Sequence, residues 1–323
     1  MGIARAEPLD PAPLDRVLAR GAEADMAWLR TQRAERLDPA RLLPGARSVV
    51  ALALAHAFAP PLDDPGAGRA AVARYARGRD YHGVMRRRLK DLVGRLRARD
   101  PGLRAFPSSD VAPVMEKAWA ARAGLGWVGK NGCLITPELG SWVLLATVIL
   151  DRDLAPDAPH PERCGECTAC LPACPTGAIP EPGLVDARRC LSFHTIERRG
   201  VVPDEVAARV GRWGFGCDDC QTACPWNRAP GGASDPELVA ARHPSLDLHQ
   251  LLALDIEAYR RGFYGTALAR AGQAGLIRNA VLVAGANREV RFREAVRRLA
   301  SSGLPGVAAA ARWALKRLGG GGG

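Results

Sequence analysis

The chain has 323 residues, of which 47% are hydrophobic, so it can bury a large core and is not expected to be disordered. Its longest apolar runs, 48–60 and 142–150, are too short to span a membrane, and its first residues include Arg5, Glu7 and Asp10 in place of an apolar signal core. We therefore expect a cytoplasmic protein that does not associate with a membrane. In the cytoplasm, clustered cysteines bind metal more often than they form disulfides.

Basic residues outnumber acidic residues 45 to 34, which gives a net charge of +11. Nearly all of them are Arg, since Lys occurs only at positions 90, 117, 130 and 316. Arg binds phosphate with a bidentate fork, so this charge is typical of a protein that binds nucleic acid. A genome rich in G and C also encodes Arg in place of Lys, and the charge alone leaves both explanations open.

The first part of the chain, residues 1–156, mixes helical and strand patterns and is predicted to be an α/β domain. Two serines precede Asp110, and Asp is a preferred N-cap, so one interpretation of Asp110 is the cap of a helix that starts near Val111. The other predicted elements are a helix over 11–31, a strand over 48–55, an amphipathic helix over 82–99, and strands over 133–136 and 142–150.

Residues 157–230 hold eight of the nine cysteines together with many Pro and Gly, which indicates a domain organised by metal. Four of the cysteines follow the bacterial ferredoxin spacing C-x2-C-x2-C-x3-C, ending before Pro175, in which the first three thiolates bind one cluster and the fourth binds another. A structural zinc site more typically has two separated Cys pairs, so the array predicts a ferredoxin-like domain with two 4Fe–4S clusters. These four cysteines are Cys164, Cys167, Cys170 and Cys174.

A second array, C-x2-C-x3-C followed by Pro225, lacks one ligand, because Gly214 stands where a ferredoxin repeat would have its first cysteine. The missing thiolate must come from Cys190 or Cys133, and we favour Cys190 because it lies between the arrays. Cys133 is then predicted to be a buried strand residue. One cluster is assigned to Cys164, Cys167, Cys170 and Cys224, and the other to Cys174, Cys190, Cys217 and Cys220.

From residue 231 the sequence is predicted to be helical up to residue 318, with helices over 290–300 and 306–318 and a glycine tail over 319–323. Two clusters in series can carry electrons, but the cysteine-rich segment is too small to hold a substrate site as well. The N-terminal part must therefore supply the chemistry, and the chain is predicted to be an oxidoreductase.

Several motifs resemble those of epoxyqueuosine reductases and follow the family's order between about Met26 and Leu318. The cysteine core is shared with ferredoxins and with reductive dehalogenases, whereas the whole set is specific to the family. The motifs are DYH at 80–82, AGLG at 123–126, GKN at 129–131, RCLSF at 189–193, GFGCDDCQ at 214–221, CPWN at 224–227 and Arg278-Asn279-Ala280.

The resemblance implies a cobalamin-dependent enzyme of queuosine biosynthesis that reduces epoxyqueuosine to queuosine at the wobble position of tRNA. In this family cobalamin carries out the reduction step, and an unidentified low-potential donor supplies electrons to the clusters. The implied fold is α+β, with a cobalamin-binding catalytic domain over 1–156, a ferredoxin-type double 4Fe–4S domain over 157–230, and HEAT-like helices over 231–318 that contact the anticodon stem-loop. We expect the enzyme to act as a monomer.

The resemblance also places the proton donor at Asp110, against its interpretation as a helix cap. To donate, this carboxyl must stay neutral near pH 7, which burial beside an apolar corrin would favour. The implied cofactor contacts are Arg36, Tyr75, Asp80, Tyr81, Asp110, Leu134, Asp218, Asp219 and Gln221. The Arg-rich C-terminal helices suggest tRNA contacts at Arg270, Arg278, Arg288 and Arg291, for which a solvated helix face is the alternative.

Two Asp-x-His pairs, at 80–82 and 247–249, lack the glycine of the cobalamin motif in which His binds cobalt, so no histidine ligand is expected. Glu116 and Lys117 are expected to be ordinary helix residues. Two other functions stay open: an iron–sulfur electron-transfer protein, and a corrinoid enzyme like the reductive dehalogenases that acts on a small molecule. The first leaves the α/β part unexplained, and the second predicts an export signal and no basic helical tail.

Overall fold

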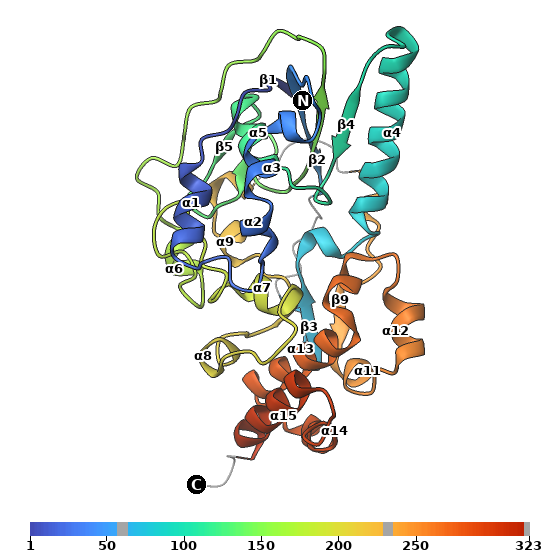
Figure 1. The fold of residues 1–323 in the computed structure, drawn as a ribbon. Helices are drawn as coiled ribbons and strands as arrows, with labels where there is room; N and C mark the ends of the chain where they lie inside the picture. Colours follow the sequence, from blue (N-terminus) through green and yellow to red (C-terminus); the bar gives the residue numbers. More distant parts are fainter. Residues whose placement is uncertain (57–63, 229–234, 320–323) are drawn as a thin grey trace.

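The structure of the chain is a computed structural model that describes residues 1–56, 64–228 and 235–319 (Figure 1). Its largest sheet has four strands in the order β1-β2-β7-β4, and every neighbouring pair is antiparallel. The predicted strand over 48–55 is confirmed, and the antiparallel pairing shows that this sheet is not the parallel sheet of an α/β fold. The strands are β1 (Gly2–Arg5), β2 (Ser48–Ala55), β7 (Val143–Leu150) and β4 (Ala105–Ser108).

Both faces of this sheet are covered, which explains why β2 and β7 are apolar at almost every position. Successive strand residues point to opposite faces. Val49 contributes to a core shared with α5 (Glu116–Arg122), and Val50 contributes to a second core shared with α4 (Tyr81–Arg99). The predicted helix over 82–99 is therefore confirmed, and Asp80 caps it by accepting a backbone hydrogen bond.

The predicted single helix over 11–31 is wrong, because the chain turns between α1 (Ala12–Ala19) and α2 (Trp28–Thr31). Gly21, at φ +60°, ends α1, since a glycine in the left-handed region is the common end of a helix. The short α3 (Arg33–Leu37) follows. Leucines from α1 and α3 pack into the same core as α5, which places this segment beside the large sheet.

A second, three-stranded sheet connects distant parts of the chain. Its central strand β3 (Arg69–Val72) pairs in parallel with β8 (Trp213–Phe215) and antiparallel with β9 (Ser245–Asp247). Each strand comes from a different one of the three predicted domains, and one continuous core runs through all three. The three parts are therefore interleaved, and the predicted boundaries stay a prediction.

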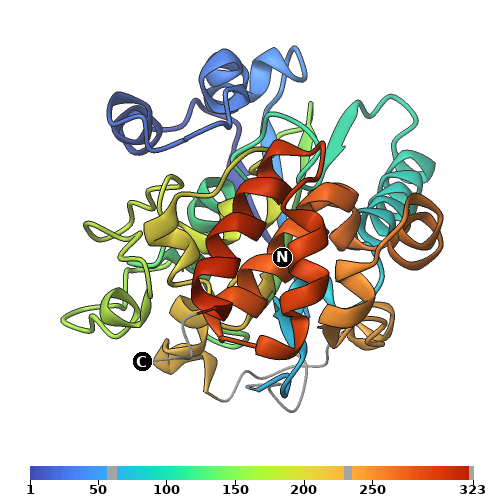
Figure 2. The ribbon, with the colours of Figure 1, turned by 90° about the horizontal axis from the view of Figure 1, so that it is seen from below.

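The C-terminal part is helical. Its helices α13 (Gly272–Ala286) and α15 (Pro305–Leu318) pack against each other (Figure 2). Gly285 permits this close packing, since a Cβ there would lie 2.7 Å from the Cβ of Ala314. The predicted helix over 306–318 is confirmed, and the one over 290–300 begins as a 3-10 turn before α14. The other helices here are α10 (Pro236–Val239), α11 (Leu248–Leu252), α12 (Ile256–Phe263) and α14 (Arg293–Leu299).

The cysteine-rich segment contains only short elements joined by turns. A two-residue hairpin lies against it, so the strand predicted over 133–136 is shorter than expected. No helix in the described ranges has both the length and the apolar character that crossing a membrane requires. The short elements are β5 (Trp127–Val128), β6 (Leu134–Ile135), α6 (Cys170–Ala173), α7 (Leu191–Ile196), α8 (Asp204–Ala207) and α9 (Asp219–Thr222).

Candidate active site

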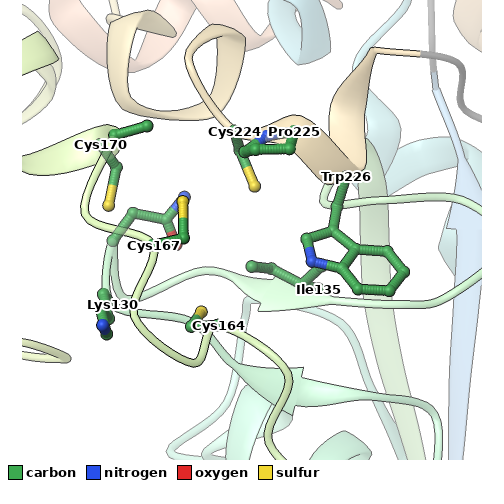
Figure 3. Close-up of a pocket in the computed structure, with 10 residues that line it drawn as sticks. Lys130, Ile135, Cys164, Cys167, Cys170, Cys224, Pro225 and Trp226 are labelled. Carbon is green, nitrogen blue, oxygen red and sulfur yellow. The ribbon is translucent and has the colours of Figure 1, made fainter.

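The four cysteines assigned to the first cluster line one cavity of about 310 Å³, beside Ile135 and Trp226. Figure 3 shows their sulfurs pointing into this space from α6, from the loop before it and from the start of the 3-10 turn at 225–227. The indole of Trp127 donates a hydrogen bond of 3.4 Å to one of the sulfurs, that of Cys164. In the described ranges no three His, Cys, Asp or Glu side chains are gathered tightly enough for a single ion, whereas this cavity has room for a group of several atoms.

A second group of thiols lies around Cys220. Burial raises the pKa of Cys220 well above its ordinary value, and the nearby Cys133, Cys190 and Cys174 raise it further. Cys217 has Cys220 and Cys190 as neighbours. Cys133 is half-buried and precedes β6, so its predicted place inside a buried strand is wrong. Five thiols therefore gather where four are needed, and the choice of Cys190 over Cys133 stays a prediction.

Asp110 lies on the loop between β4 and α5, with its side chain 69% exposed. Its φ of +55° is unusual for a residue other than glycine. The loop is held by Ser109, whose hydroxyl donates to the carbonyl of Leu145 (2.7 Å), and by Glu116, whose carboxylate accepts the Asp110 N–H (2.9 Å). Because α5 begins only at Glu116, Asp110 does not cap it, and the helix-cap interpretation is wrong.

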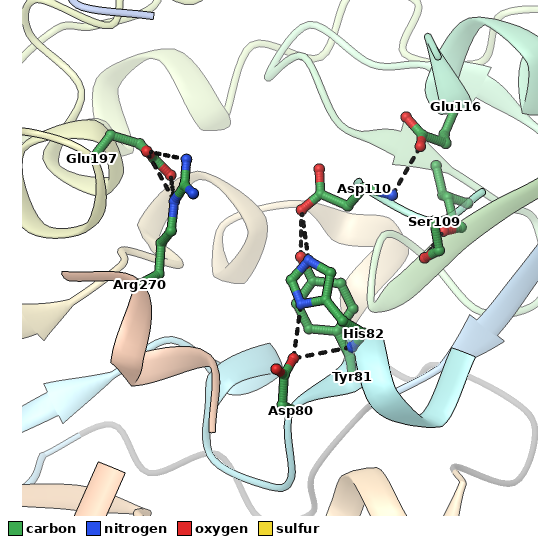
Figure 4. Close-up of polar contacts among 9 residues, drawn as sticks. Asp80, Tyr81, His82, Ser109, Asp110, Glu116, Glu197 and Arg270 are labelled. Carbon is green, nitrogen blue, oxygen red and sulfur yellow. Dashed lines mark hydrogen bonds and ion pairs between the residues drawn. The ribbon is translucent and has the colours of Figure 1, made fainter. Parts of the chain in front are cut away.

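Two side chains from the first turn of α4 meet the Asp110 carboxylate (Figure 4). The hydroxyl of Tyr81 donates to Oδ2 of Asp110, and Nε2 of His82 lies 3.6 Å from the same oxygen. On its other side, Nδ1 of His82 lies 2.7 Å from Oδ1 of Asp80. His82 is therefore placed between two carboxylates, although the sequence interpretation gave it no role.

This arrangement sets the charges at the site. The nearby carboxylates of Asp110 and Asp80 stabilise the imidazolium and raise the pKa of His82 to about 9. Partial burial opposes ionisation of Asp110, but the nearby His82 and the hydrogen bond from Tyr81 outweigh it and hold the pKa of Asp110 below its ordinary value. The expectation that Asp110 itself stays neutral near pH 7 is therefore wrong for this structure, since its neighbours stabilise the charged form.

Other predicted site residues lie around Asp110. Tyr75, in the 3-10 turn Arg74–Ala76, contacts Tyr81 edge to face at 5.8 Å between ring centroids. Arg36 lies near enough for the negative charge of Asp110 to act on it. Arg270 forms a bidentate ion pair with Glu197 (2.9 and 2.8 Å), and its positive charge lowers the pKa of Asp110 further.

Comparison with known proteins identifies the family. A model for a 4Fe-4S double cluster binding domain matches residues 163–227, and the model Epoxyqueuosine reductase QueG, DUF1730 matches residues 36–109. The epoxyqueuosine reductase of Gloeobacter violaceus is 46% identical over 296 residues, which cover 89% of this chain and 92% of the relative. The chain belongs to the epoxyqueuosine reductase family. It is an oxidoreductase of queuosine biosynthesis with a double 4Fe–4S domain.

Further members agree in sequence and fold. The epoxyqueuosine reductase of a Synechocystis species is 41% identical over 271 residues, or 81% of this chain and 91% of the relative. An epoxyqueuosine reductase solved with an epoxyqueuosine-modified tRNA-Tyr stem loop superposes with a TM-score of 0.88 at 32% identity, over 98% of this chain and 86% of that one. The Bacillus subtilis enzyme, solved with its aspartate-bearing catalytic loop swung out of the active site, gives 0.87 at 31% identity over the same shares.

Two of the cofactor contacts expected for an epoxyqueuosine reductase, Leu134 and Asp218, are buried, and their contact with the cofactor stays a prediction. Leu134 is only 2% exposed and packs in the core with Trp119, so its side chain does not line an open site. Asp218 is also 2% exposed, and its carboxylate accepts the backbone N–H of Arg74 (2.8 Å). Burial raises the pKa of Asp218 to about 6.

Asp219 and Gln221 are half-buried, and both use their side chains within the protein. Asp219 accepts a hydrogen bond of 3.0 Å from the indole of Trp213, and Gln221 accepts one of 2.8 Å from the hydroxyl of Ser141. Their contact with the cofactor stays a prediction.

Arg278 is the clearest correction among the expected tRNA contacts. Its side chain is 2% exposed, and its guanidinium donates to the carbonyl oxygens of Arg198 (2.6 Å), Gly200 (3.2 Å) and His194 (2.5 Å). A buried guanidinium with these partners cannot bind tRNA phosphates. The apolar residues on both sides of Arg278-Asn279 in the sequence are the signal that could have indicated its burial.

The remaining expected tRNA contacts do not lie together. Arg270 precedes α13, whereas Arg288 and Arg291 follow it and are exposed. A helix of 15 residues is about 22 Å long, so the two ends present separate surfaces. Arg291 is also paired with Glu289 at 2.6 Å. Only Arg270 lies beside Asp110.

Proposed function

We propose that the protein reduces epoxyqueuosine to queuosine at the wobble position of tRNA, with cobalamin as cofactor and Asp110 as the residue that protonates the epoxide oxygen. The observation that carries this proposal is an exposed carboxylate held by Tyr81 and His82 in a member of this reductase family. The solved relative with a modified tRNA stem loop supports the choice of substrate.

The residues around Asp110 suit a corrinoid. Nε of Arg36 is buried and has no hydrogen-bond partner within the described part of the chain, and this residue lies near Asp110 and Glu116. Corrinoids carry amide and phosphate oxygens that would accept such a donor, and the half-buried ring of Tyr75 offers a flat apolar surface beside it. When bound, cobalamin would supply a strongly reduced cobalt, fed with single electrons by the two clusters.

Asp110 is placed to protonate the departing oxygen. In Figure 4 its Oδ2 faces Tyr81 and His82, while the other carboxylate oxygen points away from them. A proton on this free oxygen would be available to a substrate that lies over the loop. The left-handed backbone of Asp110 and the swung-out loop of the B. subtilis relative both support a loop that can change its position.

The charge of the chain supports an RNA substrate. The net charge is +11, and the wobble base lies in an anticodon loop, where the base is already unpaired and can be turned into a site without melting a duplex. Arg270 would contact the nucleotide that enters, and Arg288 and Arg291 would contact phosphates farther along the RNA. Arg278 is excluded by its burial.

The experiment that tests the proposal compares Asp110→Asn with the parent, both reconstituted with clusters and cobalamin. Conversion of epoxyqueuosine-containing tRNA is followed by mass spectrometry of the released nucleosides. Loss of a general acid should lower turnover by roughly a hundredfold or more, while cobalamin and tRNA binding persist. Asp91→Asn, on the exposed face of α4, is the matched control. Near-parental turnover by Asp110→Asn would overturn the role of Asp110.

A further inference from the structure

His82 and its partner Asp80 form a charged group that the proposed role of Asp110 leaves unexplained. Reduction of an epoxide to an alkene takes two electrons and two protons, and the oxygen leaves as water. Asp110 can deliver one proton at a time, and its surroundings hold it in the ionised form. Some other group must therefore supply each proton that Asp110 delivers.

Contacts with Asp80 and Tyr81 fix the position of the His82 ring beside Asp110. Its Nδ1 lies 2.7 Å from Oδ1 of Asp80, and its ring stacks on Tyr81 with 4.0 Å between centroids. Asp80 is itself anchored, because it accepts the backbone N–H of His82 (3.0 Å) and donates its own N–H to the carbonyl of Gly265 (3.1 Å). Nε2 is thereby directed at Asp110, 3.6 Å away.

Charged groups from several elements surround this position. On α4 and its cap are Asp80 and Arg86, on the β4–α5 loop is Asp110, and across the site are Arg270, whose positive charge acts on Asp110, and its ion-pair partner Glu197. The two carboxylates in contact with the imidazole keep it protonated at neutral pH. The His82 side chain is 28% exposed, so water can return a proton to it.

We propose that His82, positioned by Asp80, stores the proton that Asp110 passes to the epoxide oxygen. The inference rests on the proposed function. The proton moves from Nε2 of His82 to the Asp110 carboxylate, and then to the oxygen as its carbon–oxygen bond breaks. His82 takes up another proton from water and supplies the second one in the same way. Two electrons enter through the clusters. Together with the two protons, they convert the epoxide into the alkene and water.

Substrate binding would itself trigger the first transfer. In the open site, water stabilises the pair of Asp110 carboxylate and His82 imidazolium. When a nucleotide covers the loop and excludes water, a charged pair becomes costly relative to the neutral pair of carboxylic acid and imidazole. The proton therefore shifts to Asp110 at the moment when an acid is needed. Tyr81, which donates to the same carboxylate oxygen, holds the group in place during this exchange.

The first test needs no turnover. Ring nitrogens of the six histidines are titrated by NMR in labelled, cluster-loaded protein, and the His82 signal is assigned by its absence from His82→Gln. One ring should stay protonated until about pH 9, and Asp80→Asn and Asp110→Asn should each lower that value. A wild-type protein in which no histidine stays protonated above pH 8 would overturn the inference, even if the variants fail to fold.

The second test measures single turnover of pre-reduced, cobalamin-loaded enzyme on epoxyqueuosine-containing tRNA from pH 5 to 9. His82→Gln should lose at least roughly tenfold at pH 8 and recover toward low pH, where water can protonate Asp110 directly. Asp80→Asn should show the same trend more weakly. His249→Gln is the control, because His249 follows Asp247 in the same Asp-x-His cap and is exposed on α11.

The outcomes separate the inference from the function on which it rests. If Asp110→Asn is inactive at every pH while His82→Gln follows the parental pH profile, the proton store is excluded and the proposed function stands. If Asp110→Asn turns over normally, the proposed function fails first.

Discussion

Arg278 on α13 donates a hydrogen bond of 2.5 Å to the carbonyl oxygen of His194 on α7. Together with its bonds to Arg198 and Gly200, this contact joins the C-terminal helices to the chain that follows Cys190. Asn279 strengthens the junction, because its amide donates to the carbonyls of Thr195 (2.7 Å) and Gly214 (2.9 Å). The Arg-Asn pair thus connects three segments that are far apart in the sequence.

Arg278→Ala should destabilise the fold and leave the affinity of the folded protein for tRNA unchanged. The substitution leaves three carbonyl groups without their donor, and we expect a loss of about 2 to 4 kcal/mol in the free energy of unfolding, measured with urea. Arg298→Ala, at a side chain 69% exposed, is the control and should change it by less than about 0.5 kcal/mol. A stable Arg278→Ala protein that binds tRNA poorly would reverse this assignment.

Iron content tests the choice of the eighth ligand. Reconstitution without oxygen should load about eight irons per chain, in two clusters of four. Cys133→Ser should keep all of them, because Cys133 is predicted to be the spare thiol of the five around Cys220, whereas Cys190→Ser should lose one cluster. Iron and sulfide analysis with the visible absorption of the clusters gives the answer. The opposite pattern would move the ligand to Cys133.

Local patterns in the sequence predict secondary structure correctly only where interactions between neighbouring residues determine it. The apolar run of β2 and the capped, amphipathic α4 have the expected bounds within one residue. The serines before Asp110 suit an N-cap, but α5 begins only at Glu116, whose carboxylate accepts the Asp110 N–H, so this local pattern alone does not predict the loop. Contacts between distant residues were out of reach: Arg278 meets carbonyls about 80 positions away, and His82 meets Asp110 only after α4 and β4 have packed.

The stability of the protein should depend on pH through His82. Its pKa is raised to about 9 in the folded chain, from an ordinary value of 6.5. A raised pKa stabilises the fold fully below pH 6.5, and this contribution is lost as the pH rises through 9. The free energy of unfolding of the parent should therefore fall between these values, and His82→Gln should flatten the fall while His249→Gln leaves it intact. Parallel curves for parent and His82→Gln would contradict the charged His82 in this structure.

Salt dependence tests the basic surface at the far end of α13. Each phosphate neutralised by the protein should lower the logarithm of tRNA affinity by roughly 0.7 to 0.9 per logarithmic unit of salt, because counterions are released on binding. Replacing Arg288 and Arg291 together with Ala should weaken binding and flatten that slope, whereas Arg5→Ala, on β1 at the opposite end of the molecule in Figure 1, should not. Turnover at saturating tRNA should stay near the parental value, since both arginines follow the end of α13 that is opposite Arg270, the arginine beside Asp110. If the double variant binds tRNA with the parental slope, these arginines belong to a solvated surface, and the RNA phosphates are held by another part of the protein.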